Sequence, residues 1–172
     1  MAGGCQAQAI TLAAPPGRGP DLEHRPAGDL TWCTARPVTL SPVHLALAAI
    51  VVPDYDQAIN FFVSALGFEL VEDSQSLTND GRPKRWVVVR PPGADTGLLL
   101  ARADGEQQTA AIGNQTGGRV AFFLRTDDFD AACRRMTAAG VEFVTKPRSE
   151  PYGKVTVFLD IAGNKWDLIG PA

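Results

Sequence analysis

Histidine is scarce in this chain, and its positions limit the chemistry available to the protein. The 172 residues hold two histidines, His24 and His44, and none follows position 44. Imidazole is the commonest ligand of catalytic transition metals and the usual general base near neutral pH. The three cysteines, Cys5, Cys33 and Cys133, are widely spaced and form no CxxC pair. They indicate neither a disulfide framework nor a zinc site, and they favour a cytoplasmic protein.

Other catalytic patterns are also missing. The sequence contains no G-x-S-x-G elbow, no P-loop and no GxGxxG fingerprint. Cys133 lies in a predicted helix beside Arg134 and Arg135, and no histidine is near it in sequence to activate a thiolate. The paired acids Asp127 and Asp128 are better explained as the cap of that helix than as a catalytic dyad. We therefore predict no catalytic residue from motifs alone.

The charge and hydropathy patterns exclude two classes of partner. Lys and Arg number 16 against 19 Asp and Glu, the formal net charge is −3, and the basic residues are dispersed. This balance lacks the basic patch of a nucleic-acid surface. No stretch of eighteen or more apolar residues occurs, so the sequence predicts no membrane-spanning helix.

Composition divides the chain near residue 41. Residues 1–41 hold five of the 13 prolines and show no sustained hydrophobic period, which predicts a flexible Pro/Gly-rich N-terminal extension. A signal peptide fits poorly, because the start lacks a basic region and its apolar run is short. The remainder, residues 42–172, has the length and composition of a single folded domain.

The first part of that domain, residues 42–103, predicts a βαβββ module. Residues 44–52 form an apolar run that is typical of a strand buried on both faces. Asp54 caps a helix over residues 55–66, and Gly67 ends it. Three further strands are predicted at residues 68–71, 85–90 and 97–101.

The second part repeats this order after a polar linker at residues 104–117. Strand 119–124 precedes a helix that Asp128 caps and Gly140 ends, and strands follow at 141–144, 154–159 and 165–169. A shift of 74 positions places residues 54–56 on residues 128–130, and a one-residue gap then aligns the two glycines. The repeat predicts a second module at residues 118–172, and two such sheets can pair edge to edge around a common cavity.

The pattern resembles the vicinal oxygen chelate superfamily, which includes glyoxalase, extradiol dioxygenases and the bleomycin- and fosfomycin-resistance proteins. The resemblance spans residues 43–171. It rests on Pro53-Asp54 before the helix, on residues 66–69, on residues 127–144 and on the closing segment 158–168. It implies an α+β fold in which two paired βαβββ modules form a curled mixed sheet around a cavity.

The resemblance also implies where a metal would bind. Members with metal chemistry bring one ligand from the first and last strand of each module, and these positions map to Leu47, Leu98, Ala121 and Asp167. If the alignment of the two modules is shifted by one residue, Gly97 or Leu99 takes the place of Leu98, and neither side chain has a donor atom for a metal. A single carboxylate does not hold a catalytic divalent ion, so we expect no metal and no other cofactor.

The same resemblance predicts a ligand-binding cavity. Its candidate residues are Leu47, Ala49, Trp86, Leu98, Arg119, Ala121, Phe123, Tyr152 and Asp167. Phe123 could stack on a planar ligand, and Arg119 could meet an anionic one. Asp167 has two interpretations: it pairs with Arg119 or Lys165 or hydrogen-bonds a turn, or it is a cavity carboxylate for a cationic or hydroxylated ligand.

Together these features favour a metal-free protein that binds a small apolar or aromatic compound and forms a homodimer. Two alternatives remain open. One is a lyase, isomerase or dioxygenase-like enzyme that holds a metal through other residues or uses Asp167 for acid–base chemistry. The other is an interaction module whose cavity has collapsed.

Overall fold

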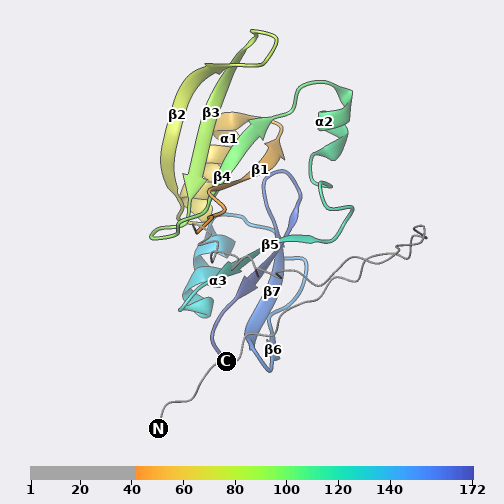
Figure 1. Ribbon diagram of the computed structural model, residues 1–172. Helices are drawn as coiled ribbons and strands as arrows, with labels where there is room; N and C mark the ends of the chain where they lie inside the picture. Colours follow the sequence, from red (N-terminus) through yellow and green to blue (C-terminus); the bar gives the residue numbers. More distant parts are fainter. Residues whose placement is uncertain (1–41) are drawn as a thin grey trace, which may run out of the picture. The chain divides into compact units, whose positions relative to one another are not determined.

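The computed structural model describes residues 42–172, which form two βαβββ modules (Figure 1). Module one consists of β1 (Leu47–Val52), α1 (Tyr55–Asn60), its π-helical continuation η1 (Phe61–Ala65), β2 (Glu69–Leu77), β3 (Pro83–Arg90) and β4 (Gly97–Arg102). Module two consists of β5 (Val120–Arg125), α3 (Phe129–Ala138), β6 (Arg148–Glu150), β7 (Gly153–Leu159) and β8 (Lys165–Ile169). The predicted linker contains a short helix, α2 (Glu106–Ala111), beside the sheet of module one. The prediction for residues 1–41 lies outside the described residues.

Both modules have the same sheet topology, which confirms the α+β prediction. The strand orders are β1-β4-β3-β2 and β5-β8-β7-β6, with β1 parallel to β4, β5 parallel to β8, and the other pairs antiparallel. Within residues 42–172 no ladder joins the two sheets, so one copy of the chain does not form the single curled sheet that the sequence predicted. β1 and β5 each remain at a sheet edge.

The repeat is confirmed by the matching ends of the two long helices. The Asp54 carboxylate accepts a hydrogen bond from the Gln57 amide (3.0 Å), and Asp128 accepts one from the Ala131 amide (2.8 Å). Gly67 ends the first helix with φ 75°, a conformation that side chains disfavour. The same caps at the same spacing therefore start the same element in both modules.

The modules differ in the strand that follows the helix. Residues 141–144, predicted as a strand, form only one isolated bridge, between Phe143 and Phe158. The edge of this sheet is instead β6, a strand of three residues, whereas β2 has nine. Pro147 and Pro151 flank β6 and have no N–H to donate, which keeps this ladder short.

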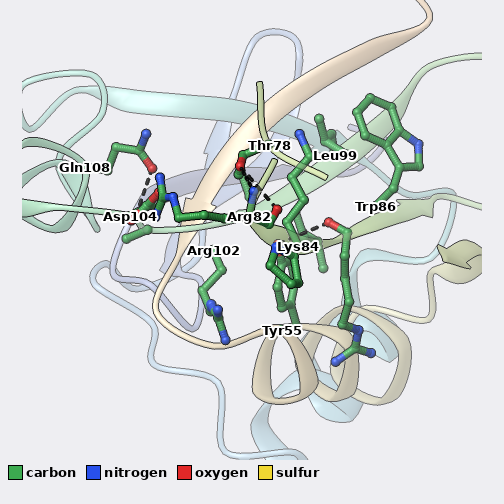
Figure 2. Close-up of a pocket in the computed structure, with 14 residues that line it drawn as sticks. Tyr55, Thr78, Arg82, Lys84, Trp86, Leu99, Arg102, Asp104 and Gln108 are labelled. Atoms are coloured by element: carbon green, nitrogen blue, oxygen red, sulfur yellow. Dashed lines mark hydrogen bonds and ion pairs between the residues drawn. The ribbon is translucent and has the colours of Figure 1, made fainter. Parts of the chain in front are cut away.

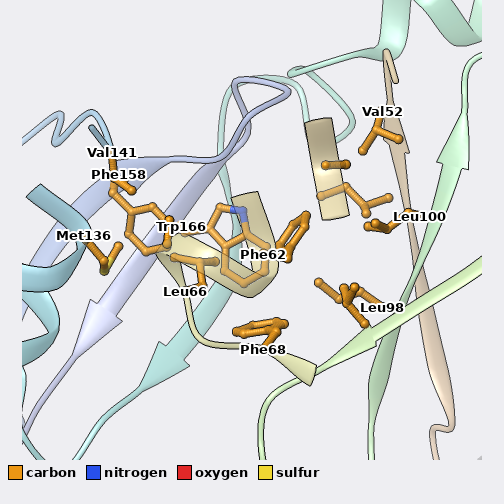
Figure 3. Close-up of a cluster of buried hydrophobic side chains, with 14 of the residues drawn as sticks. Val52, Phe62, Leu66, Phe68, Leu98, Leu100, Met136, Val141, Phe158 and Trp166 are labelled. Carbon is orange, nitrogen blue, oxygen red and sulfur yellow. The ribbon is translucent and has the colours of Figure 1, made fainter. Parts of the chain in front are cut away.

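One hydrophobic core runs through both modules (Figure 3). The Phe62 ring of η1 lies 5.9 Å from the Trp166 ring of β8, which also stacks on Phe122 at 4.4 Å. The indole N–H of Trp166 donates to the buried Asp160 carboxylate (2.9 Å). The core therefore contains the helices and the sheet faces that contact them, while each sheet keeps a second face directed away from its helix.

Arg135 of α3 adds a polar contact between the modules. Its guanidinium donates to the carbonyls of Ala65 (3.3 Å) and Leu66 (3.2 Å), at the end of η1. Terminal helix carbonyls have no partner within the helix, and a cation is favourable there. Within residues 42–172, none of the helices has the length and apolar character needed to cross a bilayer.

Candidate functional site

The face of the module-one sheet that points away from α1 collects three of the predicted cavity residues. Leu47 pairs with Gly97 and Ala49 pairs with Leu99 along the β1–β4 ladder. A Cβ built on Gly97 would lie 3.1 Å from the Leu47 side chain and 3.2 Å from that of Val88, so these residues share one face. Trp86 stands two residues before Val88 on β3 and lies on the same face.

Leu98 does not belong to this face, and the prediction for it is wrong. It is 7% exposed and packs in the core cluster with the residues under the helix. Its neighbour Leu99 is half-buried on the opposite face, because successive strand residues alternate. The repeat shift of 74 positions makes Ala49 the counterpart of Phe123. Because Ala49 pairs with Leu99 and Phe123 pairs with Asp167, Leu99 is the counterpart of Asp167.

The corresponding face of module two carries Phe123, Asp167 and Val157 in one row across β5, β8 and β7. Phe123 is 66% exposed, which is unusual for a phenyl ring in a strand. Ala121 lies at an irregularity in the β5–β8 register, between the pairs that Val120 and Phe122 form. This face therefore presents an aromatic ring beside a carboxylate at the sheet edge.

Asp167 forms neither ion pair that the sequence suggested. Among residues 42–172, no salt bridge joins it to Arg119 or Lys165, and the Lys165 ammonium donates to the Gly118 carbonyl instead (3.0 Å). Arg119 is exposed just ahead of β5. The carboxylate of Asp167 is thus half-buried without a direct cationic partner in the described part of the chain.

Arg148 lies close enough to Asp167 for the carboxylate to act on its charge. The hydrogen bond from Arg148 to Glu150 (2.9 Å) raises the pKa of the guanidinium, and the charges of Tyr152 and Asp167 raise it further. The Tyr152 side chain is 57% exposed in the turn between β6 and β7. The second face therefore offers a phenyl ring and one carboxylate, which suits recognition of a ligand with both apolar and polar parts.

The four positions at which this fold would hold a divalent ion do not fit one. They carry Leu47, Leu99, Ala121 and Asp167, of which only Asp167 has a donor atom. Residues 42–172 contain no group of three His, Cys, Asp or Glu side chains close enough to hold a metal. His44 is exposed ahead of β1, and His24 lies outside the described residues. These four positions therefore do not supply the ligand set of a catalytic metal ion.

Cys133 has the environment of a structural thiol. It is half-buried on α3, and burial raises the pKa of the thiol, as does the nearby charge of Asp130. A raised pKa lowers the fraction of reactive thiolate at neutral pH. These features support the expectation that Cys133 is not a nucleophile.

A pocket of about 260 Å³ opens where β3 and β4 separate (Figure 2). The two strands pair only from Val87 to Val89 on β3 and from Leu98 to Leu100 on β4. Beyond these pairs β3 stays with β2, and β4 stays with β1 as far as Arg102. The sheet therefore splits into two ribbons, and the gap between them is the pocket. Figure 2 shows Trp86 at one end of this pocket and Gln108 at the other.

Tyr55, the first residue of α1, fills the gap on the helix side. Its hydroxyl donates to the carbonyl of Arg85 (3.1 Å), a β3 residue beyond the last pair with β4. The guanidinium of Arg85 lies 5.2 Å from the centre of the Tyr55 ring, and that of Arg102 on β4 lies 5.5 Å from it. The ring thus contacts one arginine from each ribbon, an arrangement that is favourable for a cation on an aromatic face.

An ion-paired clasp closes the far end of the pocket. Arg82, in the turn before β3, pairs with Asp104 after β4 through both guanidinium nitrogens and with Asp80 through Nε (2.8 Å). Hydrogen bonds from Thr78 and Arg82 lower the pKa of Asp80 to about 2. The Arg82 hydrogen bond also lowers the pKa of Asp104. These carboxylates therefore remain charged near neutral pH, and the clasp stays closed.

A second ion-paired group anchors β3 to its neighbours on the helix side. Arg85 donates to Asp73 on β2 (2.9 Å) and to Asp56 on α1 (2.7 Å). These hydrogen bonds raise the pKa of Arg85 and lower that of Asp73. The bidentate contact with Asp73 fixes the guanidinium that packs on Tyr55.

Sequence reasoning found only part of this site. It selected Trp86, which lines the pocket, but it missed Tyr55, Lys84 and Arg102. The sequence predicted strands at residues 85–90 and 97–101, yet nothing in a one-dimensional pattern indicates that two adjacent strands separate along part of their length.

Comparisons with known proteins identify the same fold. The family model described as the Glyoxalase/Bleomycin resistance protein/Dioxygenase superfamily matches residues 42–168. An uncharacterized protein of Shewanella frigidimarina (strain NCIMB 400) is 52% identical over 130 residues, which are 75% of this chain and 92% of that protein. This relative supports the family without indicating a ligand.

Two solved structures extend the comparison. TnmS3, described as an antibiotic binding protein from Streptomyces sp. CB03234, is 32% identical, with a TM-score of 0.60 over 77% of this chain and 99% of its own. A superfamily member from Sphaerobacter thermophilus DSM 20745 is 33% identical, with a TM-score of 0.58 over 76% of this chain and 99% of its own. With the family model covering both modules, the chain belongs to the Glyoxalase/Bleomycin resistance protein/Dioxygenase superfamily.

Proposed function

We propose that this protein binds a small apolar or aromatic compound without a metal ion. The observation that carries the proposal is the pocket of about 260 Å³ between β3 and β4, which opens beside Trp86 and Leu99 on the outer sheet face. Small-molecule sites are concave and mostly apolar, with a few polar groups that orient the ligand. In this pocket an indole and leucyl side chains supply the apolar contacts, and the rest of the wall is polar and charged.

The comparison with TnmS3 supports a binding role. That protein is described as antibiotic binding and shares 32% of its residues with this chain over nearly its whole length. The superfamily also contains enzymes, and fold alone does not separate the two classes. The donor-poor set Leu47, Leu99, Ala121 and Asp167 favours binding over metal-dependent catalysis.

We further propose that the functional unit is a homodimer in which a second copy covers the outer sheet faces. Phe123 is 66% exposed on such a face, and β1 and β5 both lie at sheet edges in the described residues, where the Gln115 amide bonds the β1 backbone at Ala49 and Val51. Exposed apolar side chains beside unpaired strand edges favour association. A cavity between modules would then be completed by two chains. Light scattering after gel filtration tests this, and a monomer at micromolar concentration would contradict it.

The binding proposal is tested with N-phenyl-1-naphthylamine, a neutral aromatic probe whose fluorescence rises in apolar surroundings. We expect saturable binding of one probe per site and a higher melting temperature in its presence, because a ligand of the folded state stabilises it. Trp86→Leu should weaken binding about tenfold, as expected for loss of a central aromatic contact. Val71→Ser, an exposed position on β2 that lies outside the pocket, is the matched control and should bind normally.

Two results would overturn the proposal. Absence of probe binding, together with no thermal shift in a panel of planar aromatic compounds, would remove the binding role. A stoichiometric divalent ion in the purified protein, measured by plasma mass spectrometry after dialysis, would remove the metal-free assignment. The second result would favour the lyase, isomerase or dioxygenase-like alternative.

A further inference from the structure

We infer that the pocket between β3 and β4 recognises an acidic group, so that the ligand is an aromatic compound carrying a carboxylate or sulfonate. This inference rests on the proposed function and adds the chemical class of the ligand. It begins from the charges on the pocket wall. The charged side chains that line the pocket are Arg82, Lys84, Arg85, Arg102 and a single carboxylate, Asp104.

Two of the four cations are already neutralised by carboxylates. Arg82 pairs with Asp80 and Asp104, and Arg85 pairs with Asp56 and Asp73. Each of these guanidinium groups is held by two acidic side chains, so its donors are already engaged. These pairs shape the pocket and are not expected to bind its occupant.

Lys84 and Arg102 differ from these two in their surroundings. Among residues 42–172, neither has a carboxylate within salt-bridge distance. The Lys84 ammonium lies 6.0 Å from the centre of the Trp86 ring, and the Arg102 guanidinium lies 5.5 Å from that of Tyr55. Aromatic faces orient a cation without cancelling its charge, so both groups remain able to bind an anion.

The two free cations border the same space from opposite ribbons of the sheet. Lys84 belongs to β3 and Arg102 to β4. Both also line a smaller opening on the helix side of the gap, where Asp54 and Asp56 of the helix start are the acidic neighbours. An anion in the gap would meet positive charge from both strands at a site partly withdrawn from water, where Coulomb attraction exceeds its strength in bulk solvent. Trp86 and Leu99, at the outer rim, would contact the aromatic part of the same ligand.

The experiment compares two probes that share one skeleton. N-phenyl-1-naphthylamine is neutral, and 8-anilinonaphthalene-1-sulfonate adds one sulfonate to the same ring system. We expect the sulfonate probe to bind at least tenfold more tightly to the full chain, with a preference that falls as NaCl is raised. Lys84→Gln and Arg102→Gln should each reduce this preference severalfold, measured as the ratio of the affinities for the two probes.

Three control variants make the result specific. Arg134→Gln removes an exposed cation of α3 that lies outside the pocket and should change neither affinity. Lys84→Arg and Arg102→Lys keep the charge and should retain the preference for the sulfonate. Thermal melts of each variant without probe show that the fold is intact, and if one glutamine variant unfolds the other still tests its own cation.

The outcomes separate this inference from the proposed function. Equal binding of both probes, or a sulfonate preference that both glutamine variants retain, overturns the acidic-ligand inference and leaves small-molecule binding standing. Failure of both probes to bind, with the protein folded, overturns the proposed function as well. Loss of the sulfonate preference in the glutamine variants alone supports the assignment of Lys84 and Arg102.

Discussion

The hydroxyl of Tyr55 donates a hydrogen bond of 3.1 Å to the carbonyl of Arg85, just beyond the point where β3 stops pairing with β4. A helix residue thus engages the strand backbone at the position where the two ribbons separate. The Tyr55 side chain is almost fully buried, and its ring contacts arginines from both strands. The depth of the candidate pocket therefore depends on one side chain of α1.

Tyr55→Phe tests this relationship. The variant keeps the ring and removes one hydrogen bond, so we expect the free energy of unfolding to fall by about 1 kcal/mol. Tyr55→Ala also leaves a cavity and should cost about 3–5 kcal/mol, as other buried aromatic truncations do. Urea denaturation at neutral pH measures both values. A phenylalanine variant as stable as the parent protein would show that the hydroxyl adds nothing to the fold.

The assignment of Leu98 and Leu99 to opposite sheet faces gives a second prediction. Leu98→Ala should destabilise the protein by about 2–5 kcal/mol, because its side chain is in the core. Leu99→Ala should cost less than about 1.5 kcal/mol, since that side chain is only half-buried, and should instead weaken probe binding. Paired urea unfolding curves and probe titrations distinguish the two variants. If Leu99→Ala were the more destabilising of the two, Leu99 and not Leu98 would face the core, and the register of β4 would be shifted by one residue.

The Arg82 clasp predicts a specific loss of stability in acid. The pKa of Asp80 is lowered from 3.8 to about 2, and that of Asp104 is also lowered. A carboxyl group with a lower pKa in the folded state stabilises the fold above its unfolded pKa, and this contribution disappears as the pH falls through the folded value. The stabilisation by the charged carboxylates of the clasp should therefore decrease between about pH 4 and pH 2. It should be modest because the clasp is exposed to solvent.

Arg82→Gln provides the comparison for that pH dependence. The melting temperatures of the parent protein and the variant should differ at pH 6 and converge as the pH approaches 2. Raising NaCl at pH 6 should also reduce the difference, because salt screens exposed charges. A difference that stays constant across this pH range would show that the clasp does not stabilise the fold through its charges.

The contact of Arg135 with the end of η1 predicts that this residue stabilises the pairing of the modules. Arg135→Met retains much of the aliphatic chain and removes the donors to the Ala65 and Leu66 carbonyls. We therefore expect the free energy of unfolding to fall by about 1–2 kcal/mol. Arg134→Met, its exposed neighbour, should have little effect. Denaturant melts of both variants give the comparison, and equal stabilities would remove the proposed role of Arg135.

Much of the fold followed from local sequence signals. Asp54 and Asp128 marked the helix starts, Gly67 and Gly140 marked their ends, and the repeat between them predicted two similar modules. These features depend on backbone conformation and capping within a few residues, which a sequence pattern expresses directly. Residues 141–144 do lie against β7, through backbone hydrogen bonds at Glu142 and Val144, but these are too few for a continuous ladder, and Pro147 helps to keep the chain out of a longer one.

The candidate site was less accessible to prediction. The family resemblance implied that Phe123 and Asp167 share one face, and their pairing across β5 and β8 agrees with that placement. It misplaced Leu98, because an alignment uncertain by one residue reverses the face of a strand. Lys84 and Arg102 had no local signal, since each is an ordinary charged residue at the end of a strand.

By itself, the sequence determined the two modules, their helix caps and the absence of imidazole from the positions where this fold would place metal ligands. Those properties are set by residue identity and by spacing of a few positions. Only the tertiary structure decided that β3 and β4 separate, that Tyr55 fills the gap and that Lys84 and Arg102 border one pocket. These relationships join residues up to 47 positions apart, and they depend on which backbone groups remain paired when two sheets and their helices pack together.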